Sequence, residues 1–321
     1  MDAHAVAARL KSDGVAPLAA VGWARREGTG VVMDTGGDTT RVFDLASMTK
    51  PVTALAVAAA GLRTRALGEV LPAVAGTFAA AAPLEQVLAH RAGLVAHEPL
   101  FVPLLLGAQR SEVLRAAADA ARPEVRRLAS AAGYPPVYSD LGYILAGEAL
   151  AHAAGTRDAG EAQERLVLAP AGLAGHVGTS RAVRAHGVDL PRLAAPTEEV
   201  PWRGGVVRGV VHDENAWALT GEGGSGHAGL FGTVEGVLRF GCAVLDALHG
   251  SGPWRDGGAA VDITWTVTPR PGSSLRAGFD GKSEHGYTSA GARLGPRAFG
   301  HLGFTGTSLW IDPDAHVVVC V

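Results

Sequence analysis

A serine and a lysine three positions apart carry the sharpest chemical signal in this chain. Ser47 and Lys50 form an S-x-x-K motif at the start of a predicted helix, Pro51–Leu62, in which only Thr53 is polar. Both side chains would share one helical face, and the helix N-terminus would offer free N–H groups to an oxyanion. Partial burial favours the neutral amine of a lysine, which can accept a serine proton. The motif predicts a serine nucleophile. The alternative is that Ser47 only caps the N-terminus of the helix and that the side chain of Lys50 extends to solvent.

Two later segments add groups that can transfer protons or contact a substrate. Tyr138 and Asp140 precede a predicted helix, where a phenol and a carboxylate could face a shared cleft. The alternative is a core tyrosine beside an aspartate that caps the helix. His301 lies in the glycine-rich segment 300–306 of a predicted strand, whose small residues could let a substrate lie along the strand edge. A glycine-rich hairpin with an incidental histidine explains that segment equally well.

The composition excludes several classes of protein. Of the 321 residues 47% are apolar and 18% are charged, and the net charge is −3, so we expect a folded chain without a nucleic-acid partner. The two cysteines, Cys242 and Cys320, match no metal or disulfide spacing. The segment 221–232 lacks a phosphate-binding motif, and the adjacent residues 212–214 are too close in sequence to converge on a metal. No metal or organic cofactor is implied.

No stretch of the sequence is apolar and long enough to span a membrane. The longest apolar runs without charge, Pro51–Leu62 and Leu71–Leu84, are shorter than the roughly 18 to 20 residues required. The N-terminus, Met1-Asp2-Ala3-His4, has no leader-like segment. As written, the sequence predicts a cytoplasmic protein, or a periplasmic or exported one if a presequence has been removed.

Periodicity predicts strands and a helix at both ends of the chain with helices between them. We expect residues 176–232 to be mostly loops. The predicted helices are 2–13, 51–62, 65–81, 84–90, 110–121, 141–154, 158–169 and 234–248, and the predicted strands are 17–24, 30–34, 297–304, 307–311 and 316–321, with turns at 25–29 and 312–315. This order predicts an α+β fold: an antiparallel sheet flanked by helices with an inserted helical domain. The predicted sheet domain comprises residues 1–62 and 214–321, and the helical domain comprises residues 63–213.

The three chemical segments, in this order and at these separations, resemble the serine β-lactamase and penicillin-binding-protein superfamily. The resemblance is closest to the branch of class C β-lactamases, D-alanyl-D-alanine carboxypeptidases and related esterases. It extends over residues 15–321 and includes the segments His90-Arg91-Ala92-Gly93-Leu94, 211–216, 227–231 and 307–313. It implies the β-lactamase/transpeptidase fold, with the serine in the cleft between the two domains.

The resemblance implies a role for each candidate residue. Ser47 would be the acylated nucleophile, Lys50 its activating amine and Tyr138 the proton relay. The backbone N–H groups of Ser47 and Phe304 would form the oxyanion hole, and His301 would occupy the position of the lysine in a K-T-G motif. The implied activity is amide hydrolysis of the β-lactamase or D-alanyl-peptidase kind through an acyl-enzyme. A small-ester esterase and a catalytically weak binding or scaffold protein are the alternatives.

The substrate-binding positions depart from the family pattern. Gly303 and Asp140 complete the predicted substrate-binding set, but Asp140 replaces an asparagine of many relatives, and the chain stops at Val321 in its last strand. At position 301 a histidine with an ordinary pKa of about 6.5 is mostly neutral above pH 7. We therefore expect the KM for a carboxylate substrate to rise between pH 6 and 8. A β-lactam, a D-alanyl peptide and a small ester all remain as substrates, and no oligomeric state is predicted.

Overall fold

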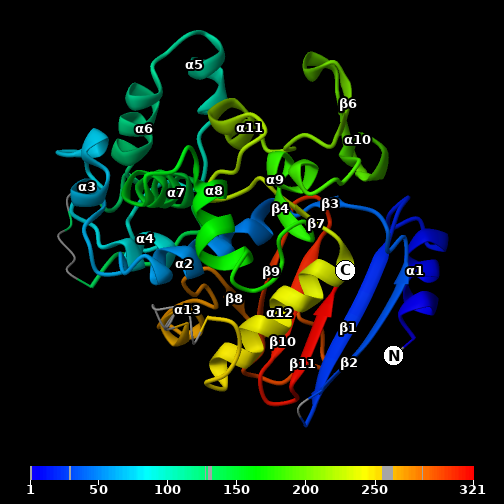
Figure 1. Cartoon of the computed structure of the whole chain (residues 1–321). Helices are drawn as coiled ribbons and strands as arrows, with labels where there is room; N and C mark the ends of the chain where they lie inside the picture. Colours follow the sequence, from blue (N-terminus) through cyan, green and yellow to red (C-terminus); the bar gives the residue numbers. More distant parts are fainter. Residues whose placement is uncertain (1, 29, 127, 129–131, 255–262, 284) are drawn as a thin grey trace.

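Six antiparallel strands in the order β2-β1-β11-β10-β9-β8 form the main sheet (Figure 1). The computed structural model describes residues 2–28, 30–126, 128, 132–254, 263–283 and 285–321. The strands of this sheet are β1 (Ala20–Glu27), β2 (Gly30–Gly37), β8 (Asp280–Gly281), β9 (Phe299–Leu302), β10 (Ser308–Asp312) and β11 (Val317–Cys320). Because β1 pairs with β11, strands from the two ends of the chain meet in the middle of one sheet.

The first hairpin is longer than the sequence indicated. Its strands pair from Ala20 opposite Gly37 to Glu27 opposite Gly30, so residues 25–27, predicted as turn, belong to β1. The polar residues at the end of β1 are exposed or partly buried, and they still pair with β2 through their backbones. The predicted turn at 312–315 does connect β10 to β11.

Two helices pack on the sheet (Figure 1). The N-terminal helix α1 (Ala3–Ser12) contacts β1 and β2, and α12 (Val234–Leu248) contacts β1, β10 and β11. Both match their predicted positions. The approach of α12 requires small residues: a Cβ on Gly22 of β1 would lie 2.6 Å from a Leu238 methyl group of α12.

The remaining elements lie mainly beside the sheet (Figure 1). The prediction of one helix over residues 65–81 is wrong: a short helix, α3, ends at Val70, and Pro72 has no N–H group with which to continue it. The prediction that residues 176–232 are mostly loops is also wrong, because this segment contains several short helices and strands. The helices are α2 (Thr49–Ala59), α3 (Leu67–Val70), α4 (Leu84–Leu88), α5 (Phe101–Leu105), α6 (Arg110–Asp119), α7 (Asp140–Ala154), α8 (Ala159–Gln163), α9 (Ser180–Ala185), α10 (Leu190–Leu193), α11 (Glu214–Thr220) and α13 (Thr264–Val267), with short 3-10 or π turns η1 (Ala46–Met48), η2 (Pro72–Val74), η3 (Glu164–Leu168) and η4 (Pro201–Arg203). A small three-stranded sheet has the order β3 (Phe43–Asp44), β7 (Leu230–Gly232), β4 (Val177–Thr179). A two-stranded sheet contains β5 (Pro196–Val200) and β6 (Gly205–Arg208).

Helix α2 occupies the centre of the core, as its apolar sequence predicted. Its residues from Thr49 to Val57 are all buried, and it contacts α7, α8 and η3. Its one polar residue beyond the first turn, Thr53, donates a hydrogen bond to the Gly226 carbonyl oxygen at 2.6 Å. Burial on all sides holds the first turn of α2, which carries Lys50, in a fixed position.

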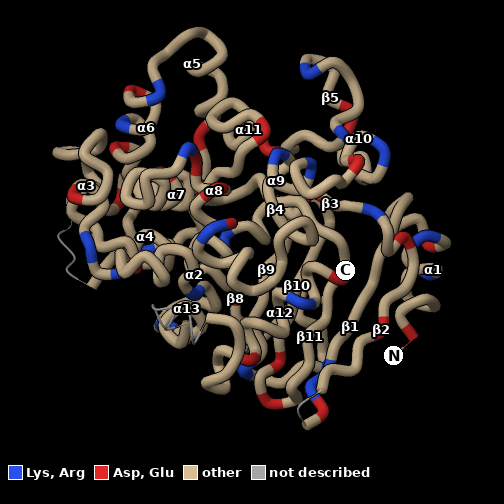
Figure 2. The backbone as a smooth tube through the Cα atoms, in the orientation of Figure 1, with Lys and Arg blue, Asp and Glu red and all other residues tan. Residues whose placement is uncertain are grey.

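The architecture confirms the predicted α+β class with its antiparallel sheet and many helices. The division into a sheet domain and an inserted helical domain, with boundaries at residues 62/63 and 213/214, stays a prediction. Within the described ranges, no helix has the length and apolar character to cross a membrane. Lys and Arg residues are interspersed with Asp and Glu residues around the backbone (Figure 2).

Candidate active site

Ser47 lies on a tight turn between β3 and α2. Ala46, the residue before it, has a φ of 45°, which is rare for a residue with a side chain. The buried Asp44 carboxylate stabilises this turn by accepting hydrogen bonds from the Ala46 N–H at 2.8 Å and the His212 N–H at 2.7 Å. Burial raises the pKa of Asp44 to about 6 despite these hydrogen bonds. Asp44 thus connects the Ser47 turn to the segment before α11, a role that local sequence patterns did not predict.

Lys50 is fully buried one turn after Ser47. Its Nζ donates a hydrogen bond to Ser47 Oγ at 2.7 Å and lies 2.8 Å from Asp140 Oδ1. A longer hydrogen bond, 3.4 Å, reaches the carbonyl oxygen of His227. The S-x-x-K pair therefore shares one face, as predicted, and the lysine does not reach solvent.

The expected neutral state of Lys50 is contradicted by its surroundings. Burial by itself lowers the pKa of Lys50, but the interactions with Tyr138 and Asp140 outweigh it and raise that pKa above its ordinary value. Burial alone would raise the pKa of Asp140, while Lys50 and His97 lower it well below its usual range. The two groups are therefore an ammonium and a carboxylate at neutral pH.

Asp140 is available for this ion pair because its neighbour caps the helix. Ser139 is the N-cap of α7, and its Oγ accepts the Gly142 N–H at 3.3 Å. The alternative in which Asp140 caps the helix is therefore wrong. Asp140 Oδ2 lies 3.6 Å from His97 Nδ1, and this contact raises the pKa of His97.

The Tyr138 ring lies close to Lys50 and to two histidines. Lys50 Nζ is 4.8 Å from the centre of the Tyr138 ring, which stacks on the His90 ring at 4.6 Å and lies 6.0 Å from the His301 ring. Tyr138 is only partly buried. The structure thus brings together residues that lie 91 and 163 positions apart along the chain.

His90 positions the segment that carries Tyr138, a role the sequence did not assign to it. It has a φ of 60°, and its Nδ1 accepts the Ser139 N–H at 3.0 Å. Burial, with the Lys50 charge, lowers the pKa of His90 to about 3. A neutral ring is required, because a protonated Nδ1 could not accept that hydrogen bond.

His301 stays neutral over a wider pH range than the sequence indicated. It is buried on β9, and its Nδ1 lies 2.7 Å from the Leu302 carbonyl oxygen. Burial and the Lys50 charge lower the pKa of His301 to about 3. The expected titration of His301 between pH 6 and 8 is therefore wrong.

The turn after β9 contacts the Ser47 segment directly. Thr305 Oγ1 donates to the Asp44 carbonyl oxygen at 2.6 Å, and Thr307 Oγ1 donates to the Leu45 carbonyl oxygen at 3.4 Å. Gly303 permits this approach, because a Cβ there would lie 2.6 Å from the Leu45 oxygen. Within the described structure, the backbone N–H groups of Ser47 and Phe304 donate to no other group. Both amides are thus free for the predicted oxyanion hole.

A cleft of about 370 Å³ opens at Ser47. Asp140 and Phe304 line it together with Ser47, whereas Lys50 lies beneath its floor. The other lining residues are Ala46, His97, Glu198, His212, Asp213, Glu214 and Ala228. The cleft is large enough for a small substrate, and its lining is acidic.

A buried chain of hydrogen bonds links Asp213, which lines the cleft, to His227 and Ser225. His227 Nε2 lies 2.8 Å from Asp213 Oδ1, and its Nδ1 lies 3.0 Å from Ser225 Oγ. Burial alone would raise the pKa of Asp213, but His227 and the Ala216 N–H lower it to about 2. Although these types are those of a catalytic triad, Ser225 is buried and outside the cleft lining. These hydrogen bonds hold in place the His227 backbone carbonyl, which accepts a hydrogen bond from Lys50.

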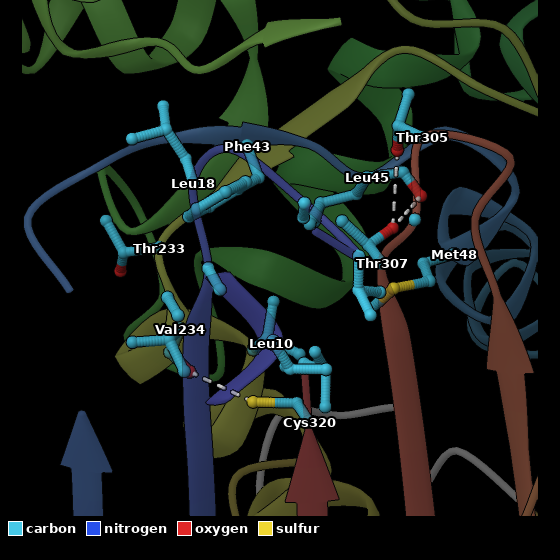
Figure 3. Close-up of a pocket in the computed structure, with 18 residues that line it drawn as sticks. Leu10, Leu18, Phe43, Leu45, Met48, Thr233, Val234, Thr305, Thr307 and Cys320 are labelled. Atoms are coloured by element: carbon cyan, nitrogen blue, oxygen red, sulfur yellow. Dashed lines mark hydrogen bonds between the residues drawn. The ribbon is translucent and has the colours of Figure 1, made fainter. Parts of the chain in front are cut away.

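An apolar pocket of about 150 Å³ lies behind the Ser47 turn (Figure 3). Leu45 and Met48 line it on one side and Val234 and Cys320 on another, whereas Ser47 is absent from its described lining. It is therefore separate from the candidate active site. Among the described residues, no group of three or more His, Cys, Asp or Glu side chains is arranged to hold a metal ion.

Solved structures share this fold over nearly the whole chain. A β-lactamase/D-alanine carboxypeptidase from Pseudomonas syringae matches with a TM-score of 0.69 and 15% identity, covering 98% of this chain and 91% of its own. A β-lactamase from Mycobacterium bovis matches with a TM-score of 0.55 and 23% identity, covering 97% and 89%. A D-stereospecific amidohydrolase from Streptomyces matches with a TM-score of 0.62 and 18% identity, covering 99% and 93%. These likenesses define the fold class.

The sequence itself assigns the family. The family model described as Beta-lactamase matches residues 6–321, so the chain belongs to the β-lactamase family. It is accordingly an enzyme, a serine hydrolase of the β-lactamase superfamily. A search of curated protein sequences found no match.

The pH dependence of substrate binding should follow His97 rather than His301. His97 has a raised pKa and lines the cleft, so it gains positive charge as the pH falls through neutrality. We expect the KM of a carboxylate substrate to rise with pH through an inflection above about pH 6.5. This inflection should persist in His301→Asn and disappear in His97→Gln. The reverse pattern in the KM profiles from pH 5 to 9 would contradict this assignment.

Removing the Asp140 carboxylate should destabilise the fold. Asp140→Asn leaves the buried Lys50 without its anionic partner, which should cost on the order of 3 kcal/mol in the free energy of unfolding. Because the pKa of Asp140 is lowered in the folded state, this contribution is complete above about pH 4 and is lost only at lower pH. Urea unfolding at pH 5 and pH 7 should give the same loss. The control Asp13→Asn, at an exposed ion pair, should cost less than about 0.5 kcal/mol; equal losses in both variants would contradict the prediction.

Proposed function

We propose that this enzyme cleaves an amide or ester bond through an acyl-enzyme on Ser47. The observation that carries the proposal is the 2.7 Å contact between Lys50 Nζ and Ser47 Oγ at the floor of the cleft. A hydroxyl beside a buried ammonium is stabilised as it develops negative charge. The Tyr138 ring and the Asp140 carboxylate lie against the same ammonium.

In the proposed acylation, Ser47 Oγ attacks the carbonyl carbon of the substrate and forms a tetrahedral intermediate. The N–H groups of Ser47 and Phe304 donate hydrogen bonds to its oxyanion. Because Lys50 is held protonated, it cannot accept the Ser47 proton. We assign the transfer of this proton to Tyr138. As the bond between the carbonyl carbon and the departing amine or alcohol breaks, the Tyr138 hydroxyl gives its own proton to the departing group and its oxygen takes the proton of Ser47.

Deacylation repeats these steps with water as the nucleophile. The oxygen of the water bonds to the acyl carbon and forms a second tetrahedral intermediate. As this intermediate collapses and the bond to Ser47 Oγ breaks, the Tyr138 hydroxyl gives its proton to Oγ and its oxygen takes a proton from the attacking water. The products are a carboxylic acid and the free enzyme.

Amide hydrolysis of the β-lactamase or D-alanyl-peptidase kind is the first candidate activity, supported by family membership and by the activities named for the related structures. Hydrolysis of a small ester is the second, and a specific observation favours it. His301 is neutral and the described cleft lining contains no Lys or Arg, so the lining offers no permanent cation for a substrate carboxylate.

Intact mass measured after incubation with a fluorophosphonate and with a penicillin tests the proposal. We expect a phosphonyl adduct on the peptide that contains Ser47 and none in Ser47→Ala. A penicilloyl adduct would favour amide hydrolysis of the β-lactamase or D-alanyl-peptidase kind. Turnover of an ester without a penicilloyl adduct would favour the small-ester esterase. A lack of any adduct, together with no turnover of amides or esters, would support a binding protein instead.

A further inference from the structure

The cleft at Ser47 carries more negative charge than its internal ion pairs require. Four of its ten lining residues are carboxylic acids, and none of these described lining residues is Lys or Arg. Two of the acids have partners: Asp140 pairs with Lys50, and Asp213 pairs with His227. Glu198 and Glu214 remain as excess negative charge at the cleft.

Neither glutamate is matched by a permanent cation within the described structure. Glu198 is 62% exposed and approaches only His212, with Oε2 3.6 Å from Nε2. The Glu214 side chain forms no ion pair or hydrogen bond with the described residues, and its charge raises the pKa of His97 and opposes the lowering of that of Arg203. Arg203 is a permanent cation that interacts electrostatically with Glu214. Its guanidinium donates to the carbonyl oxygens of Val211 and His212 at 2.7 Å and is absent from the cleft lining.

An exposed aromatic ring lies at the same end of the cleft. Phe304 is 83% exposed although it lines the cleft, and its ring stacks on His212 at 5.6 Å. His212 is also the neighbour of Glu198, so the Phe304 ring and this carboxylate both contact one imidazole. An aromatic face beside carboxylates is the environment that an ammonium group prefers.

We propose that the substrate is a small ester or amide that carries an ammonium group, bound between Glu198, Glu214 and the face of Phe304. This inference rests on the proposed function, because it names the substrate class of the Ser47 site. The same carboxylates repel a substrate carboxylate, so the cleft selects against anionic acyl donors as well as for cationic ones.

Two pairs of isosteric substrates test the proposal on either side of the scissile bond. Acetylthiocholine and 3,3-dimethylbutyl thioacetate differ by a cationic nitrogen in the leaving group. Alanine p-nitroanilide and isobutyryl p-nitroanilide differ by an ammonium in the acyl group. We expect kcat/KM about tenfold higher for the cationic member of at least one pair. The preference should shrink in 0.5 M salt, which screens exposed charges.

Substitutions in the cleft locate the preference. Glu198→Gln/Glu214→Gln removes the two charges with little change of shape, and Phe304→Leu removes the ring but keeps its backbone N–H. Each should lower the ratio of cationic to neutral kcat/KM at least threefold. Glu235→Gln, on an exposed face of α12, is the matched control and should keep the wild-type ratio.

The outcomes separate failure of this inference from failure of the proposed function. Equal or better turnover of the neutral members through Ser47 would overturn the inference and leave the acyl-enzyme intact. A cation preference unchanged in all the cleft variants would also overturn it, because the charge would then be recognised elsewhere. No Ser47-dependent turnover of any substrate and no labelling of Ser47 would overturn both.

Discussion

Ser47→Ala should lower hydrolysis of p-nitrophenyl acetate or nitrocefin by at least about a thousandfold in kcat/KM. The proposed covalent step needs the oxygen that this substitution removes, whereas the free N–H groups of residues 47 and 304 remain. The small residual rate should come from these amides and from binding alone. Steady-state kinetics with purified protein, with the thermal unfolding midpoint measured in parallel, checks this result.

The control for the Ser47 experiment is a second serine with a hydrogen-bonded hydroxyl. Ser225 contacts His227 but is outside the cleft lining. Ser225→Ala should therefore retain the phosphonyl adduct on Ser47. Near-wild-type hydrolysis by Ser47→Ala would contradict the proposed acyl-enzyme on Ser47. A phosphonyl adduct on Ser225 would identify Ser225, hydrogen-bonded to His227, as the nucleophile instead.

Tyr138→Phe should lower kcat by about 10² to 10⁴ while the protein stays folded. The variant keeps the ring that stacks on His90 and lies beside Lys50 Nζ, so the packing is preserved. It loses the oxygen to which we assign the proton of Ser47. The phosphonyl adduct should still form on Ser47, but more slowly, because Lys50 still stabilises the developing negative charge on Oγ.

A matched tyrosine distinguishes proton transfer from packing. Tyr143 is fully buried near Lys50, and its hydroxyl donates to the Leu88 carbonyl oxygen at 2.7 Å. Tyr143→Phe should lower the unfolding midpoint with a smaller effect on kcat, because it leaves a buried carbonyl without its partner. If Tyr138→Phe instead lowers the midpoint and keeps kcat, Tyr138 is a structural residue.

Much of the fold could be predicted because it depends on local patterns. Helix α12 matches its predicted range, residues 234–248, and β9 and β11 lie within theirs, while β10 ends one residue beyond its predicted range. The errors lie where a neighbour decides the structure. The proline at position 72 divides the predicted 65–81 helix, and residues 25–27 extend β1 because β2 continues alongside them.

The sequence by itself determined the chemistry available at the site and its order along the chain. The spacing of Ser47 and Lys50 placed them on one helical face, and the order of the motifs indicated the family. The structure places Ser47 and Phe304 in the lining of one cleft, with Lys50 buried beneath it and the Tyr138 ring beside Lys50 Nζ. Their catalytic roles remain predictions.

Only the tertiary structure decided the charge states and the lining of the cleft. Lys50 stays protonated because Asp140 reaches it across 90 residues of sequence, and His301 stays neutral because burial removes water from its ring. His97 and Glu198 belong to no local motif, and Glu214 was given no role within the segment 211–216, yet all three line the cleft with Ser47. Helix and strand patterns depend on residues a few positions apart. The pKa of a side chain depends instead on solvent exposure and on charges within a few ångströms, which distant segments of the chain supply.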